Sequence, residues 1–189
     1  MPQPSTPNPT APAPAQPLER LVQLLVKLEG PPQDRGALSA LRSWWRPASR
    51  HLALPVMADL LARSGIGTQR LDDPVWTALP ALFAWHRRNE SEGRTNFGTT
   101  CRRLAGDQRE TFDTHFRRVL AAERVEDLIE ILRRHLLRAA TEGVALDYRQ
   151  LGIDLLQWRK SPESAREVKV RWAKEYFRAP AEEPAPDAP

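Results

Sequence analysis

The sequence contains one cysteine, Cys101, and no long apolar run. A single cysteine excludes an intrachain disulfide and a zinc site built from several thiolates, and it fits a reducing compartment. No stretch approaches about 18 consecutive apolar residues, so we expect no membrane-spanning helix. The first residues have neither a basic start nor an apolar core, which is unlike a secretory signal. These absences predict a soluble protein of the cytoplasm with no membrane partner.

Common catalytic motifs are missing as well. The sequence has no glycine-rich phosphate loop, no HExxH pair and no GxSxG elbow, and its four histidines are scattered. Arg102 would lower the pKa of the neighbouring Cys101 thiol, but no histidine partner is evident, so we interpret the thiol as a buried spectator. Acids such as Asp147 and Asp154 fit helix caps and solvent-facing positions. We therefore predict no enzyme: no catalytic residue, no metal, no cofactor and no small-molecule substrate.

Positive charge is abundant, and almost all of it is arginine. The formal net charge is +4, the pI is about 9.7, and only four of the 28 basic residues are lysines. Leaving out the three acids of the C-terminal tail raises the net charge from +4 to +7. Guanidinium groups form charge-assisted, often bidentate hydrogen bonds to phosphate. A GC-rich genome would also favour arginine over lysine. The positive charge is therefore a stronger indication of an anionic partner than the ratio of arginine to lysine.

Proline-rich segments flank the apolar part of the chain. Residues 1–17 and 179–189 alternate proline with small or polar residues, and the second segment is also acidic. Such sequences bury little apolar area and favour extended, solvated conformers. We expect both termini to be disordered. A proline-rich ligand for a partner's groove is the alternative for the first.

Between these segments, apolar residues recur at spacings of three and four, and no segment alternates with a period of two. We expect a first helix from Leu18, and Pro80 to kink or split a later one near Leu79. The polar stretch 90–96 suggests a boundary between an N-terminal lobe (18–92) and a C-terminal lobe (93–178). The predicted fold is all-α, a two-lobed helical bundle with disordered proline-rich termini. Expected helix caps are Asp34, Asp73, Asp107, Asp147 and Ser161.

Arginine pairs mark the predicted helices. Neighbours on a helix point about 100° apart, so one arginine of a pair can lie beside the apolar face while the other reaches solvent. Nucleic-acid binding through them would be salt-dependent and largely blind to base sequence. A solvated face with local salt bridges is the alternative, and the six tryptophans are mostly expected in the core, with Trp44 as the exception. The pairs are Arg102/Arg103, Arg117/Arg118 and Arg133/Arg134, with a further pair, Arg87/Arg88, before them, and the helix after Asp34 adds Arg35, Arg42 and Arg46.

The order of these segments resembles the CasB family, the small subunit of the type I-E CRISPR surveillance complex Cascade. No single motif carries the resemblance, which rests on order, spacing and length over about residues 18–178. The segments are DRGALSALRSWWR, FGTTCRRLAG, FDTHFRRVLAAERVEDLIEILRRHL, GVALDYRQLGIDLLQW and VRWAKEYF.

The resemblance implies a helical, two-lobed, non-catalytic subunit, present in two copies, that contacts backbone and large subunits. Its partners would be guide RNA and target DNA, and its basic surface would stabilise the R-loop and the displaced strand in antiviral defence. A protein-only scaffold and a free-standing helical DNA-binding regulator are the alternatives. The family's basic positions fall best at Arg42, Arg102, Arg117 and Arg133, and by adjacency at Arg35, Arg46, Arg103, Arg118 and Arg134.

Overall fold

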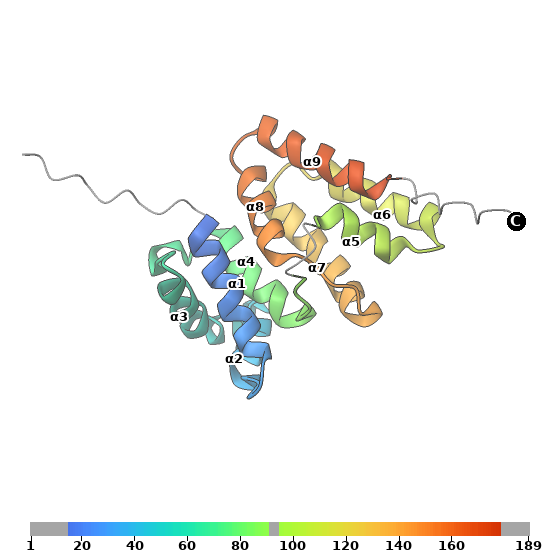
Figure 1. Cartoon of the computed structure of the whole chain (residues 1–189). Coiled ribbons are helices and arrows are strands. Elements are labelled where there is room, and N and C mark those ends of the chain that lie inside the picture. The colour runs from blue at the N-terminus through green and yellow to red at the C-terminus, as the bar shows by residue number, and fades with distance from the viewer. Residues whose placement is uncertain (1–14, 91–94, 179–189) are drawn as a thin grey trace, which may run out of the picture.

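The computed structural model describes residues 15–90 and 95–178, and the regular elements in these ranges are helices (Figure 1). Apart from one isolated bridge between Asn89 and Leu146, the described residues form helices and their connections. The all-α prediction is confirmed. The α-helices are α1 (Ala15–Glu29), α2 (Arg35–Ser43), α3 (Leu54–Ser64), α4 (Pro74–His86), α5 (Phe97–Ala105), α6 (Arg109–Ala121), α7 (Val125–Glu142), α8 (Tyr148–Trp158) and α9 (Pro162–Tyr176), with short 3-10 helices η1 (Pro47–Leu52) and η2 (Thr68–Arg70).

Local sequence signals place most helix ends. The predicted caps Asp34, Asp73, Asp147 and Ser161 each accept a hydrogen bond from a backbone N–H of the following turn, at 2.8 to 3.1 Å. These bonds satisfy donors that have no partner inside the helix. Gly143 ends α7 with a φ of 72°, a left-handed conformation that glycine adopts without a Cβ clash.

The predicted start of the first helix is wrong. α1 begins at Ala15, so residues 15–17, which we expected to be disordered, are helical. Pro17 is compatible with this position because the first N–H groups of a helix have no intrahelical partner to lose. The rest of the two segments predicted as disordered, 1–14 and 179–189, lies outside the described residues.

Asp107 does not cap α6, contrary to the prediction. The cap residue is Gln108, and its side chain makes no capping bond. After α5 the chain turns through Gly106, and the Gln108 N–H donates to the Ala105 carbonyl at 2.8 Å. Residues 105–108 form this turn, so α6 starts only at Arg109, one residue too late for Asp107 to be its cap.

Pro80 does not split its helix. α4 runs without interruption from Pro74 to His86, although proline removes one intrahelical bond. Almost every side chain of α4 is buried, and the helix packs on α2, α7 and α8. Burial on all sides thus holds α4 in one piece and makes it the centre of the molecule.

The helices form one continuous apolar core around α4. In Figure 1, α1, α2 and α3 lie on one side and α5, α6 and α9 on the other, with α4, α7 and α8 between them. Within the described residues, the buried apolar side chains of the nine α-helices belong to a single cluster. The division into lobes 18–92 and 93–178 stays a prediction, and the most extensive packing across it joins α4 to α7.

Candidate nucleic-acid interface

Arg42 and Arg133, from opposite halves of the chain, lie against two tryptophans. The guanidinium carbon of Arg42 on α2 is 6.0 Å from the Trp85 ring centroid, and that of Arg133 on α7 is 5.1 Å from the Trp45 ring. The Trp45 indole N–H donates to the Ala81 carbonyl of α4 at 3.3 Å, one turn before Trp85. α2 and α7 both pack on α4, which brings these side chains together. We call Arg42, Trp45, Trp85 and Arg133 the tryptophan–arginine cluster.

This cluster contains more hydrogen-bond donors than it uses. In the part of the chain that the structure describes, Nε of Arg42, Nε of Arg133 and Nε1 of Trp85 are buried without a partner. Arg133 has one ion pair, a long one of 3.9 Å to Glu130. Buried donors are usually satisfied, so these three are exceptions. Arg42 and Arg133 are themselves half-buried, and guanidinium groups that reach the surface suit an anionic ligand with several acceptor oxygens, such as phosphate.

Ion pairing separates the nine predicted arginines. Arg103 is occupied, because it binds both carboxylate oxygens of Glu90, at 2.6 and 3.3 Å, and this bond lowers the pKa of Glu90. Among the nine, only Arg103 and the weakly paired Arg133 form an ion pair with a carboxylate of the described residues. An unpaired guanidinium can neutralise a phosphate without first giving up an acid. The seven others, all exposed or half-buried, are Arg35, Arg42, Arg46, Arg102, Arg117, Arg118 and Arg134.

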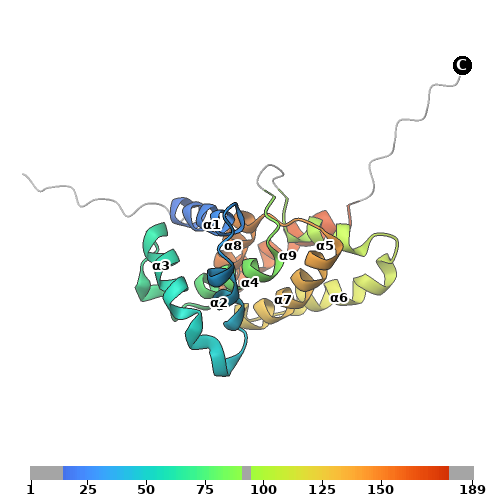
Figure 2. The ribbon, with the colours of Figure 1, turned by 90° about the horizontal axis from the view of Figure 1, so that it is seen from below.

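The pair Arg133/Arg134 divides between two sides of α7. Arg133 lies over Trp45, whereas Arg134 lines a groove between α6 and α7 that also takes Arg118. Figure 2 shows α2, α7 and α6 following one another along the lower side of the view, so the cluster and the groove flank α7. Five predicted arginines line neither the cluster nor the groove: Arg35, Arg46, Arg102, Arg103 and Arg117.

Several residues of the groove and of the tryptophan–arginine cluster were not predicted from the sequence. The groove also holds His115, His135 and Arg138, and the cluster holds Trp45 and Trp85 as arginine partners. A signal for the groove was present, because His115 precedes Arg118 by three residues and Arg134 precedes Arg138 by four. Such spacings place side chains on one helix face. No comparable signal joined Arg133 on α7 to Trp45, which lies in the turn after α2, because the two residues are far apart in the sequence.

The buried acid Asp154 is a structural residue, and its predicted solvent-facing position is wrong. Its side chain is fully buried and accepts hydrogen bonds from the Trp172 indole, from Arg171 and from Gln150. The bonds from Trp172 and Arg171 join α8 to α9, and the bond from Gln150 lies within α8. The acid compensates Arg171 and therefore does not bear on nucleic-acid binding.

The Cys101 thiol is fully buried, and burial raises its pKa well above the usual range. This confirms its interpretation as a spectator, because nucleophilic cysteines need thiolate and access. Across residues 15–90 and 95–178, no group of three or more His, Cys, Asp or Glu side chains lies close enough to hold a metal ion. In the same ranges, no helix combines the length and apolar character that crossing a membrane requires.

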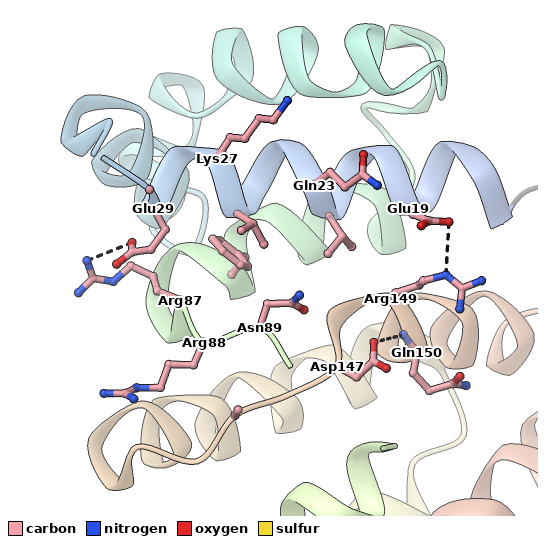
Figure 3. A pocket seen from close by; sticks show the side chains of 15 residues that line it. Glu19, Gln23, Lys27, Glu29, Arg87, Arg88, Asn89, Asp147, Arg149 and Gln150 are labelled. Carbon is pink, nitrogen blue, oxygen red and sulfur yellow. Dashed lines mark hydrogen bonds and ion pairs between the residues drawn. The ribbon is translucent and has the colours of Figure 1, made fainter. Parts of the chain in front are cut away.

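A larger cleft, of about 1200 Å³, lies between α1, the end of α4 and the start of α8 (Figure 3). Its charges are mixed and partly paired. Arg87 lies 3.5 Å from Glu29, and Arg149 lies 3.9 Å from Glu19. None of the nine predicted arginines lines it. Its acids make it a weaker site for a polyanion than the arginine-lined surfaces around α7.

The sequence and the fold match known proteins over most of the chain. The family model of the CRISPR-associated protein Cse2 matches residues 37–177. Among solved structures, CasB from Thermus thermophilus is 28% identical, with a TM-score of 0.66 over 87% of this chain and 99% of its own. A second structure from Thermus thermophilus, of a CRISPR-associated protein of the Cse2 family, is 25% identical, with a TM-score of 0.65 and the same coverage.

A chain of a CRISPR RNA-guided surveillance complex shares the fold, with 20% identity, a TM-score of 0.67, and coverage of 87% of this chain and 93% of its own. No curated protein matches the sequence. The family model covers most of the chain, and the two Thermus structures are matched almost end to end. The chain therefore belongs to the CRISPR-associated Cse2 family, that of CasB, as the order of its segments had indicated.

Proposed function

We propose that this chain is the non-catalytic small subunit of a Cascade guide-RNA complex, in which its arginines bind nucleic-acid backbone and stabilise the R-loop. Its partners are guide RNA, target DNA, the backbone and large subunits, and a second copy of itself. The observation that supports the proposal is the tryptophan–arginine cluster, where Arg42 and Arg133, from two halves of the chain, each lie over a tryptophan and each have an unpaired Nε.

Modest contacts suffice for this role. Replacing a DNA duplex by an RNA–DNA heteroduplex is close to energetically balanced, so backbone contacts to the displaced strand can decide whether the open state persists. Each phosphate that an arginine neutralises also releases counterions, which makes binding salt-dependent. Guide pairing supplies the sequence specificity, and the subunit needs to read no base.

The lifetime of the R-loop on a matched target tests the proposal. We expect the reconstituted complex to hold the R-loop longer with this chain than without it, and the gain to fall steeply as salt rises. Replacing Arg42 and Arg133 together by glutamine removes two charge-assisted contacts, so we expect the lifetime to fall roughly tenfold or more. The matched control is the double replacement of Arg63 and Arg124, two exposed arginines that already pair with Asp59 and Glu126. The lifetimes are measured at a low and a moderate salt concentration, and equal lifetimes for the two double variants at both concentrations contradict the proposal.

A protein-only scaffold is the second candidate function. Arg103 favours it, because its bidentate pair with Glu90 shows a predicted arginine engaged inside the protein. The scaffold predicts normal incorporation of this chain with no change in R-loop lifetime. A free-standing regulator predicts instead that the isolated chain binds one DNA sequence far more tightly than others.

A further inference from the structure

The groove between α6 and α7 is small, basic and open at the surface. It has a volume of about 290 Å³. All five titratable or charged side chains that line it are basic, three arginines and two histidines, and no carboxylate does so. Its lining consists of Phe112, His115 and Arg118 from α6, and Ile131, Arg134, His135 and Arg138 from α7.

The arginines of the groove are fixed to different degrees. Arg138 is held in place, because its Nε donates to Glu142 at 2.5 Å, its Nη2 donates to the Leu104 carbonyl at 3.3 Å, and its guanidinium lies over the Phe112 ring. Arg118 and Arg134 are exposed and have no ion pair within the described residues. One wall is therefore preorganised, and two free guanidinium groups can close on a ligand.

The protonation of His135 is affected by the positive charges of the groove. Its Nδ1 lies 2.9 Å from the Ile131 carbonyl, which can only accept, so Nδ1 carries the proton and Nε2 is left for another partner. Burial lowers the pKa of His135, and His115, Arg138 and Arg134 lower it further, against the opposing effect of the Ile131 bond. The other contacts of the ring are aromatic, to Phe97 of α5 and Phe112 of α6. Of the three groove arginines, Arg138 is paired with Glu142, whereas Arg118 and Arg134 have no ion pair within the described residues, so the protein compensates the positive charge of the groove only in part.

We propose that the α6–α7 groove is a binding site for a single phosphate group, held by Arg118, Arg134 and Arg138 with His135 as a further donor. The proposal rests on the proposed function where that phosphate belongs to a nucleic-acid backbone. A free phosphate offers the same chemistry. The dianion or diester supplies the acceptors that guanidinium and imidazolium need, and its charge stabilises protonated His135.

Two probes and one variant test the site in the full chain. Titration with inorganic phosphate, followed by NMR of the histidine ring resonances, should shift His115 and His135 and raise the pKa of His135. The double replacement of Arg118 and Arg134 by glutamine should abolish these shifts. The replacement of Arg63 and Arg124 removes the same charge from arginines that do not line the groove and should leave the shifts intact. Equal shifts in all three proteins overturn the site.

A single-stranded oligothymidylate distinguishes the source of the phosphate. Loss of one backbone contact should weaken binding about tenfold and reduce the slope of log K against log salt by about 0.7. If inorganic phosphate shifts His135 but the oligonucleotide binds the groove variant unchanged, the site is a free-phosphate site, and the backbone role fails there. If the groove variant binds both probes like the wild type, while the Arg42/Arg133 variant loses the oligonucleotide, the groove proposal fails and the proposed function stands.

Discussion

At the scale of single residues, Gly98 sets how closely two helices approach. A Cβ at this position would lie 2.0 Å from the backbone oxygen of Trp172, so α5 can contact α9 only because residue 98 has no side chain. The close approach places Phe97 against Trp172, with ring centroids 5.1 Å apart. The Trp172 indole in turn donates to Asp154. One missing methyl group therefore supports a chain of contacts through three helices.

We expect the substitution Gly98→Ala to lower the free energy of unfolding by about 1–3 kcal/mol or more, because backbone rather than a flexible side chain must move. Urea unfolding measures this loss. Gly36→Ala is the matched control, since a Cβ there meets only the Asp34 carboxylate at an ordinary 3.5 Å. That variant should stay within about 1 kcal/mol of the wild type. Equal stability of the two variants would show that the α5–α9 contact is looser than the structure has it.

At the scale of helices and connections, α4 is tied to the segment before α8 by one histidine. His86, in the last turn of α4, donates from Nε2 to the Val144 carbonyl at 2.7 Å. Its Nδ1 is buried and has no partner in the described part of the chain. Burial is the main reason that its pKa is lowered from the ordinary 6.5. The folded state thus favours the neutral ring of His86, although the bond to Val144 acts in the opposite direction.

This histidine makes stability depend on pH. A lowered pKa in the folded state means that the unfolded chain binds more protons below about pH 6.5, so the free energy of unfolding falls as the pH falls through this range. His135 contributes in the same direction. We expect His86→Gln, which can keep the bond to Val144 but does not titrate, to lose less stability than the wild type between about pH 7.5 and about pH 5.5. Urea unfolding at both pH values measures it, with the exposed His51→Gln as control; equal losses in the wild type and His86→Gln would contradict the assignment.

Helices and their ends could be predicted from the sequence where the cause is local. Asp34, Asp73 and Asp147 cap helices because a side-chain oxygen next to a helix start needs only its own neighbours. The alternative that Pro80 splits its helix was wrong, because tertiary packing decides there. The continuity of α4 through Pro80 depends on the helices that surround it.

The candidate site divides in the same way. Adjacent arginines could be read from the sequence, and so could their separation by about 100° on a helix. The position of Arg133 over Trp45 and that of Arg134 in the groove could not be predicted from the sequence, because both depend on how α2, α6 and α7 pack. The nine predicted arginines therefore remain a prediction as nucleic-acid contacts, and the structure adds which of them share a place.

At the scale of the whole molecule, the helical halves share one core. Leu132 of α7 is fully buried in the cluster that also contains the residues of α1 and α4. The packing of α4 on α7 crosses the predicted lobe boundary. A defect placed in α7 should therefore be felt by the first half of the chain as well as by the second.

We expect Leu132→Ala to lower the free energy of unfolding by about 2–5 kcal/mol and to raise the amide hydrogen exchange of α4 and α9 together. Exchange followed by mass spectrometry measures both helices in one experiment. Leu52→Ala, at a position that is 53% exposed, should change neither beyond about 0.5 kcal/mol. Faster exchange confined to α9 would mean that the two lobes unfold independently.

The burial of Cys101 has a practical consequence for watching this subunit at work. Its only thiol is fully buried and kept protonated, so maleimide dyes should leave the native protein unlabelled. A cysteine introduced at an exposed helical position such as Ala62 would then be the sole reactive sulfur. One fluorophore per subunit could thus be attached without first removing a native residue, and a second on the DNA would report the opening and closing of single target molecules.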